Sequence, residues 1–169
     1  MESVAEARAF AVAAHGDQRY GDRPYIVHLE AVAAIVRSYG SEAQRIAYLH
    51  DVAEDTNITL DDLRHQFGAR VAEHVALLTD EPGGDRAERK ARSHAKLANV
   101  PPELNLALVV KAADRLANLR ESARSANAKK LAMYRSEHAE FWAAAYRPGL
   151  CDDLWREIDA LMGTTVRDT

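Results

Sequence analysis

The sequence predicts an all-α protein, and three observations support that class. Apolar residues recur three and four positions apart through most of the chain, which is the spacing of one helix face. No segment alternates apolar and polar residues for long enough to predict a strand. The 8 glycines and 5 prolines fall mainly between the periodic segments. We expect helices at about 2–15, 25–39, 42–55, 59–66, 68–79, 86–98, 102–121, 126–146 and 150–161.

Capping and breaking residues delimit the first elements in chain order. Gly16 follows the first helix. Pro24 lies where a helix tolerates proline in its first turn, and Ser41 is an N-cap candidate for the third helix. Thr59, with Asp62 three residues later, resembles a capping box in which Asp replaces Glu. The later helices are expected from periodicity alone.

Composition is that of an ordinary globular protein. The 169 residues suit one domain, which we expect over residues 1–169. A chain this long, with 47% hydrophobic and 28% charged residues, can fold without a covalent staple. Cys151 is the only cysteine, which excludes a disulfide framework and a multi-thiolate zinc site and favours a reducing cytoplasm.

Charge and hydropathy argue against two classes of partner. The net charge of −4 does not suit a general nucleic-acid-binding protein. No apolar stretch approaches the roughly 18 residues that span a bilayer, and Glu2 and Glu6 stand where a signal peptide would be basic. We therefore expect neither a nucleic-acid nor a membrane partner. The sequence carries no sign of an oligomeric state, and the tail from Gly163 is expected to fray.

Histidines and carboxylates are the candidates for chemistry, because phosphate-loop, nucleophile-elbow and zinc-helix motifs are absent. On the helix at about 42–55, Asp51, Glu54 and Asp55 lie at about 100°, 40° and 140° from His50. The three carboxylates on this arc repel one another unless water or a cation compensates them. One interpretation is a solvated helix face. The other is a His/Asp pair that binds a metal while two acids handle protons.

The segment at about 104–119 is apolar almost all round, which predicts a helix through the centre of the protein. Its polar exceptions Lys111, Asp114, Arg115 and Asn118 form one stripe about 100° wide. Buried charge needs a partner or a wet cavity. A structural ion pair is one interpretation. The convergence of a Lys, an Asp and an Asn favours a site wall, with Asp114 as a metal ligand and Lys111 and Asn118 facing an anionic substrate.

A further histidine completes a possible ligand set. His28 lies in the first turn of the helix predicted at about 25–39, among apolar neighbours, where a lone histidine is usually a core residue. Together with His50, Asp51 and Asp114 it gives two histidines and two carboxylates. This mixed set suits Mn²⁺, and also Fe²⁺ or Zn²⁺, and leaves positions open for water.

These segments together resemble the HD-domain superfamily, and more narrowly the hydrolase domain of the RelA/SpoT alarmone enzymes. The resemblance spans about residues 5–121 and keeps the order and approximate spacing of the family's motifs. The matching residues are Gln18-Arg19, Pro24-Tyr25-Ile26-x-His28, His50-Asp51-x-x-Glu54-Asp55-Thr56, Phe67-Gly68 and Lys111-x-x-Asp114-Arg115-x-x-Asn118-Leu119-Arg120.

The resemblance implies an all-α HD-domain helical bundle with a metal site in its core. It implies bound Mn²⁺ and removal of the 3′-pyrophosphate from a hyperphosphorylated purine nucleotide, (p)ppGpp or (p)ppApp. The chain resembles the small members that carry a hydrolase domain only. By position, the metal ligands are His28, His50, Asp51 and Asp114; the acidic pair that activates and orients water is Glu54 and Asp55; the substrate contacts are Arg19, Tyr20, Lys111 and Asn118.

Four positions depart from the family's pattern, and they leave the metal set intact. Leu29 stands where the family usually has proline, and Tyr20 where it has a basic residue. Ala117 replaces a common histidine, and Glu121 replaces a small polar residue near the nucleoside. The departures concern nucleotide recognition, so guanine and adenine both stay open as the base.

Two alternative functions and two minor features remain. The chain could be an HD-type phosphohydrolase for another nucleotide, such as a 5′-nucleotidase, or a non-catalytic nucleotide-binding regulatory module. The basic segment 86–96 is expected to be a solvated helix or a cover over the pocket. Further candidates for neutralising phosphate charge are Lys129, Lys130 and Arg135.

Overall fold

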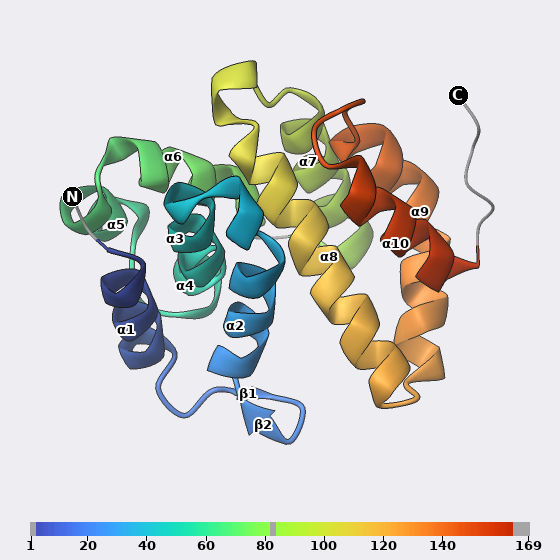
Figure 1. The fold of residues 1–169 in the computed structure, drawn as a ribbon, viewed down its shortest axis with the longest axis horizontal. Coiled ribbons are helices and arrows are strands. Elements are labelled where there is room, and N and C mark those ends of the chain that lie inside the picture. Colours follow the sequence, from blue (N-terminus) through green and yellow to red (C-terminus); the bar gives the residue numbers. More distant parts are fainter. Residues whose placement is uncertain (1–2, 82–83, 164–169) are drawn as a thin grey trace.

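A computed structural model describes residues 3–81 and 84–163, and helices dominate both ranges (Figure 1). The all-α class is therefore confirmed. The helices are α1 (Val4–His15), α2 (Ile26–Ile35), α3 (Ser41–Leu49), α4 (Val52–Asp55), α5 (Leu60–Phe67), α6 (Ala69–Leu78), α7 (Arg86–Ala98), α8 (Leu106–Arg124), α9 (Ala128–Ala145) and α10 (Asp152–Met162), with short 3₁₀ turns η1 (Arg37–Tyr39) and η2 (Pro102–Leu104).

Helix α8 runs through the middle of the protein, as its apolar sequence predicts (Figure 1). Val109, Leu116 and Leu119 on this helix are fully buried. One hydrophobic cluster packs α8 against α2, α3, α7, α9 and α10. A second cluster joins α1 to the helices from α3 to α6. Polar residues on α8 are therefore held between two groups of helices.

The helix expected at about 42–55 is broken into α3 and α4 at His50 and Asp51, which corrects the prediction. The His50 ring takes the Ala47 carbonyl oxygen as its partner, with Nδ1 at 2.7 Å. Asp51 has φ −99° and ψ −6°, away from ideal helical values. The side chain thus uses a carbonyl that would otherwise extend the helix. The ideal-helix angles predicted around His50 do not hold beyond this turn.

A small β-hairpin replaces part of the predicted loop before α2. Strand β1 (Arg19–Tyr20) pairs antiparallel with β2 (Arg23–Pro24). Pro24 therefore lies in a strand rather than in the first turn of a helix. Gly21 turns the chain with φ +62°, where a residue with a Cβ would be strained.

The predicted caps have mixed outcomes. Thr59 and Asp62 form the expected capping box at the start of α5, with Asp62 Oδ2 accepting from the Thr59 amide at 2.8 Å. Ser41 is not an N-cap, because α3 begins at this residue and Gly40 occupies the cap position.

The remaining predictions concern the core, the membrane and the tail. Cys151 is buried, and burial raises the pKa of its thiol to about 12, so it acts as a small core residue. Within the described ranges, every helix is too short or too polar to cross a bilayer. The frayed tail expected after Gly163 lies outside the described residues.

Candidate metal centre and its pocket

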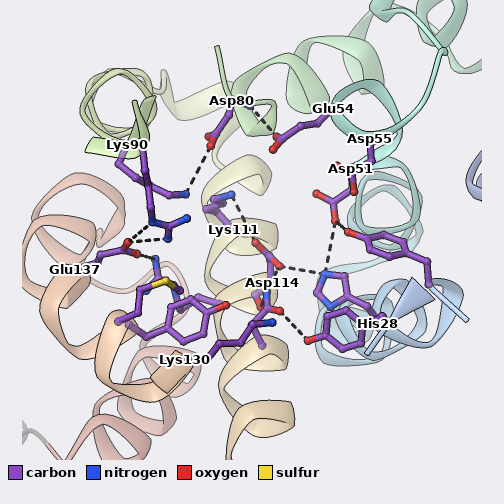
Figure 2. A pocket seen from close by; sticks show the side chains of 17 residues that line it. His28, Asp51, Glu54, Asp55, Asp80, Lys90, Lys111, Asp114, Lys130 and Glu137 are labelled. Atoms are coloured by element: carbon purple, nitrogen blue, oxygen red, sulfur yellow. Dashed lines mark hydrogen bonds and ion pairs between the residues drawn. The ribbon is translucent and has the colours of Figure 1, made fainter. Parts of the chain in front are cut away.

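The four predicted ligands meet at one place, which we call the metal wall: His28, His50, Asp51 and Asp114. Figure 2 shows three of them, His28, Asp51 and Asp114. His28 comes from α2, His50 and Asp51 from the turn between α3 and α4, and Asp114 from α8. His28 Nε2 lies 3.2 Å from Asp114 Oδ1. His50 Nε2 lies 3.1 Å from Asp51 Oδ2, and possible ligand atoms of both histidines and Asp51 all lie within 4.8 Å of one another. Residues distant in sequence therefore converge as a metal site requires.

The donor atoms of His50 fit a metal ion. Its Nδ1 donates to the Ala47 carbonyl oxygen, so in the neutral form of the ring the lone pair is on Nε2, the nitrogen that faces the carboxylates. Nε2 is buried and makes no hydrogen bond within the part of the chain that the structure describes. Two imidazole nitrogens and two carboxylate oxygens form a donor set that suits a divalent transition metal.

Electrostatics at the metal wall favour a cation. Burial alone would raise the pKa of Asp51, but His50 lowers it to about 2. Burial likewise opposes ionisation of Asp114, yet His28, His50 and Lys111 hold its pKa well below the ordinary value. Both carboxylates are thus ionised at neutral pH, as metal ligands must be. Burial lowers the pKa of His50, but the carboxylates of Asp51 and Asp114 outweigh burial and hold this pKa well above its ordinary value. Their negative charge therefore favours a cation at the metal wall.

Hydrogen bonds orient the carboxylate ligands. Asn118 donates from Nδ2 to Asp114 Oδ1 at 2.7 Å, and Tyr20 donates to Asn118 Oδ1 at 2.7 Å. Tyr25 donates to Asp51 Oδ2 at 2.6 Å. Burial followed by the charge of Asp51 raises the pKa of Tyr25, which keeps it a donor. Tyr20 and Asn118, predicted to contact substrate, therefore also hold Asp114, a predicted metal ligand, in place.

The predicted acidic pair lies beside the metal wall, and its two members have different partners. Glu54 Oε2 accepts a hydrogen bond from the Asp80 amide at 2.9 Å. Asp55 Oδ2 accepts one from Gln18 Nε2 at 2.9 Å. Burial, with the charges of Asp80 and Asp51, raises the pKa of Glu54 although the Asp80 amide opposes the shift. Glu54 is therefore a better proton acceptor than an ordinary glutamate, while remaining ionised above its raised pKa.

A pocket of about 430 Å³ opens between the metal wall and a basic surface (Figure 2). Figure 2 shows Lys90 across the pocket from His28 and Asp51. Lys130 lies at the edge of the pocket, with Nζ 5.8 Å from the centre of the Tyr20 ring. Lys111 lies between the two sides, with Nζ 3.5 Å from Asp114 Oδ2. We call the basic surface the cationic wall: Arg86, Lys90, Arg115 and Lys130.

Two predictions from the sequence concern this basic surface. The segment 86–96 lies within helix α7 and contributes Arg86 and Lys90 to the pocket lining, so it borders the pocket. Lys130 also lines the pocket, whereas Lys129 and Arg135 do not. Arg135 instead donates to the Met162 carbonyl oxygen at 3.1 Å.

Arg115 is held rigidly in the cationic wall. Its guanidinium lies 4.6 Å from the Tyr134 ring centre and 4.3 Å from that of Phe141. Glu137 Oε2 lies 3.7 Å from its Nη2. The side chain is 8% exposed, so this buried charge has aromatic and acidic partners and still lines the pocket.

Arg19 is the one predicted substrate contact that does not line this pocket. It is exposed, and its guanidinium donates to the Asp22 carbonyl oxygen within the hairpin. A second hollow of about 360 Å³ adjoins the first at Tyr20 and Lys130. A third hollow, of about 160 Å³, is lined in part by a group that we call the hairpin rim: Tyr20, Arg23, Glu121 and Arg124. Arg23 Nη2 and Glu121 Oε2 are 2.5 Å apart, which ties the hairpin to α8.

Sequence reasoning assigned no role to several residues at the site. Tyr25 and Gln18 belong to the matching motifs, but their contacts with Asp51 and Asp55 depend on the tertiary fold. Asp80 follows α6 and has no local sequence signal at all. Only the packing of α6 beside α4 and α8 brings it into the pocket wall.

Comparison with known proteins relates this chain to a protein family and to several named relatives. The sequence model of the HD domain family matches residues 7–150. The guanosine-3′,5′-bis(diphosphate) 3′-pyrophosphohydrolase MESH1 of Danio rerio is 36% identical over 148 residues, covering 83% of this chain and 80% of that protein. The human protein of the same name is 34% identical over 152 residues, covering 86% and 83%.

Two further comparisons concern a longer relative and the fold. A probable guanosine-3′,5′-bis(diphosphate) 3′-pyrophosphohydrolase of Synechocystis is 31% identical over 162 residues, and the match covers 92% of this chain but 21% of that protein. A solved structure of a metazoan ortholog of SpoT that hydrolyzes ppGpp superposes with a TM-score of 0.81 at 24% identity, covering 95% of this chain and 93% of the other. At that identity the superposition shows a shared fold.

Proposed function

Because the chain belongs to the HD-domain family, we propose that it is a metal-dependent enzyme that removes the 3′-pyrophosphate from a purine nucleotide alarmone, (p)ppGpp or (p)ppApp. Its relatives are named as hydrolases of this type. The observation that carries the proposal is the polarity of the pocket, with the metal wall on one side and the cationic wall on the other. A polyanionic substrate can thus be bound by cations while one phosphoryl group faces the metal ligands.

The metal wall is proposed to hold Mn²⁺, with Fe²⁺ or Zn²⁺ as alternatives. A divalent ion bound there would lower the pKa of a coordinated water and polarise the phosphoryl oxygen. The protein's part is to keep the ligands ionised and oriented. Tyr25 and Asn118 perform the second task through their hydrogen bonds to Asp51 and Asp114.

The acidic pair is proposed to manage the attacking water. Glu54 has a raised pKa and borders the pocket, which suits a general base that takes the proton as the phosphoryl group is attacked. Asp55 borders the same pocket and is proposed to orient the water. Lys111 lies next to the metal wall and carries a raised pKa: burial lowers it, but Asp114 and the other nearby carboxylates outweigh burial. It therefore stays charged and can neutralise phosphate oxygens.

The rest of the pocket is proposed to bind the nucleotide. A volume of about 430 Å³ is within the range of small-molecule sites. The cationic wall would bind phosphates remote from the metal, and Tyr20 and Asn118 would contact the nucleoside. Arg19 is proposed to reach the purine from the hairpin, where its long side chain is exposed.

The experiment that tests the proposal is an assay of product identity. Guanosine and adenosine 3′-pyrophosphates are incubated with the protein and Mn²⁺, with Asp51→Ala as control. Metal-dependent release of pyrophosphate, lost in the control, is the expected result. Release of orthophosphate from 5′-nucleotides instead would indicate the other hydrolase class. Nucleotide binding without any product would indicate a regulatory module.

Three further proposals concern the domain, the compartment and the partner of the protein. We propose that residues 1–169 form one HD domain, of which 7–150 match the family. We propose a reducing cytoplasm as its compartment, in keeping with the single buried Cys151. The proposed partner is a small nucleotide rather than nucleic acid, since the chain carries a net charge of −4.

A further inference from the structure

A chain of hydrogen bonds reaches the acidic pair from outside the pocket. His15 at the end of α1 has Nδ1 2.8 Å from Gln18 Oε1. Gln18 Nε2 in turn donates to Asp55 Oδ2 at 2.9 Å. Asp55 lines the pocket, but His15 and Gln18 do not. Any effect of these two residues on the reaction must therefore pass through the side chains that they hold.

The direction of this chain follows from hydrogen-bond chemistry. An ionised carboxylate only accepts, so the amide nitrogen of Gln18 must face Asp55. The amide oxygen then faces His15, whose Nδ1 must carry a proton. All three side chains are thus fixed in one orientation. A methionine at position 18 has a similar size but neither donates nor accepts strongly.

The His15 end of this series of hydrogen bonds is buried, whereas Asp55 at the other end is exposed. His15 is 7% exposed and stacks on the Tyr25 ring, with the ring centres 4.5 Å apart. Tyr25 also binds the metal ligand Asp51. The half-buried Tyr25 ring therefore contacts both His15, which holds Gln18, and Asp51 of the metal wall.

We propose that Gln18, held by His15, is a positioning residue that fixes the Asp55 carboxylate toward the pocket, a role that rests on the proposed function of Asp55. An exposed aspartate otherwise samples several rotamers. Loss of an orientation needed for catalysis lowers kcat, while substrate binding by other residues leaves KM nearly unchanged.

The test compares Gln18→Met and His15→Phe with wild type, and Asp17→Asn serves as control. His15→Phe keeps a ring beside Tyr25 but removes the donor. Asp17 is an exposed neighbour on the same loop and does not line the pocket. We expect kcat for pyrophosphate release to fall about 10-fold or more in Gln18→Met and by less in His15→Phe. KM, bound metal and Tm should stay near wild-type values, and Asp17→Asn should match wild type.

A double-mutant cycle with Asp55→Asn separates positioning from a general structural role. If Gln18 acts through Asp55, Gln18→Met should cost little further kcat in the Asp55→Asn background. Full additivity, or a loss of Tm that accounts for the lost activity, would overturn the proposal.

A measurement that does not depend on turnover keeps the two proposals distinct. Nitrogen NMR of ¹⁵N-histidine-labelled protein should show His15 protonated at Nδ1 in wild type, and a change in that signal in Gln18→Met. An unprotonated Nδ1 would overturn the hydrogen-bond chain whether or not the protein is active. Absence of pyrophosphate release from wild type, with Nδ1 protonated as expected, would instead overturn the proposed function and with it the role given to Asp55.

Discussion

The metal wall and the hairpin rim meet at Tyr20, a member of the rim whose ring stacks on His28, yet the two regions differ in burial and in chemistry. His28 and His50 of the metal wall are 3% and 1% exposed. Arg23 and Arg124 of the hairpin rim are 36% and 59% exposed. The metal wall holds the four residues that the family resemblance predicts as ligands, whereas the rim contains two of the departures from that resemblance, at Tyr20 and Glu121.

Because the two regions differ in burial, we expect them to differ in how well they tolerate amino-acid substitutions. A buried charged cluster needs each of its partners, because removing one leaves an uncompensated charge. The Arg23–Glu121 ion pair is only partly buried, so solvent screens it more than the metal wall and its exchange should cost less stability. In the proposed function, the metal wall would therefore determine the chemistry of the reaction, and the rim would be the place where recognition of the base differs.

Breaking the metal wall should give the largest effect. In Asp114→Ala an oxygen ligand is lost, His28 loses its carboxylate partner and Lys111 loses its counter-charge. We expect loss of bound metal and a fall of about 1000-fold in pyrophosphate release, since metal activation of water is worth several kcal/mol. Elemental analysis and initial rates measure both. A variant that keeps its metal and its turnover would contradict the ligand set.

Glu54→Gln should come next, because it separates chemistry from metal binding. We expect kcat to fall by about 10²- to 10³-fold, as for loss of a general base, with metal content unchanged. Equilibrium dialysis with Mn²⁺ and steady-state kinetics check the two parts. Retained turnover at full metal occupancy would rule out Glu54 as the base.

The same residue sets a pH dependence. The pKa of Glu54 is raised, and a general base works only when deprotonated, so activity should be lost as pH falls through that raised pKa. Asp80 contributes to the raised value, so Asp80→Asn should lower it and move the acid limb of the kcat profile to lower pH. An acid limb that stays in place or moves to higher pH would contradict this assignment.

A smaller effect is expected where the two regions meet. Asn118→Ala removes the hydrogen bond to Asp114 Oδ1 without removing a ligand. Loss of such a partner typically weakens metal affinity by about 10- to 100-fold, and excess Mn²⁺ should restore much of the lost rate. Metal titration of the activity provides the measurement. A defect that excess metal leaves untouched would mean that Asn118 acts on the nucleotide alone.

The smallest effect is expected at the hairpin rim. Arg23→Ala frees Glu121 from the hairpin, and we expect a change of about two- to fivefold in KM, with kcat and metal content near wild type. Arg8→Ala breaks an exposed ion pair with Glu30 that lies away from the pocket, and it serves as the matched control. A change in the ratio of guanine to adenine activity in Arg23→Ala alone would place base selection at the rim. A loss of metal from this variant would contradict the division between the two regions.

The sequence predicts most of this architecture because its signals are local or periodic. The course of α8 follows from its apolar residues and its polar stripe, and α7 has the bounds expected from periodicity. The break at His50 was missed because it depends on a side chain that captures its own helix's carbonyl oxygen. The hairpin was missed because two-residue strands leave no alternating pattern.

The site could likewise be predicted only in part from the sequence. Motif matching named the residues of the metal wall, and the fold brings them together. The contacts of Glu54 with Asp80 and of Asp55 with Gln18 join residues 26 and 37 positions apart, and no local pattern encodes them. The cationic wall likewise combines residues of three helices, so its position opposite the ligands could be learned only from the fold.

The most direct test of the central claim is a Mn²⁺ titration that follows bound metal and pyrophosphate release together. The account predicts one high-affinity ion per chain, release that rises in proportion to its occupancy, and loss of both in Asp51→Ala. Full release from metal-free protein, or a fully occupied site that releases no pyrophosphate from either purine nucleotide, would contradict it.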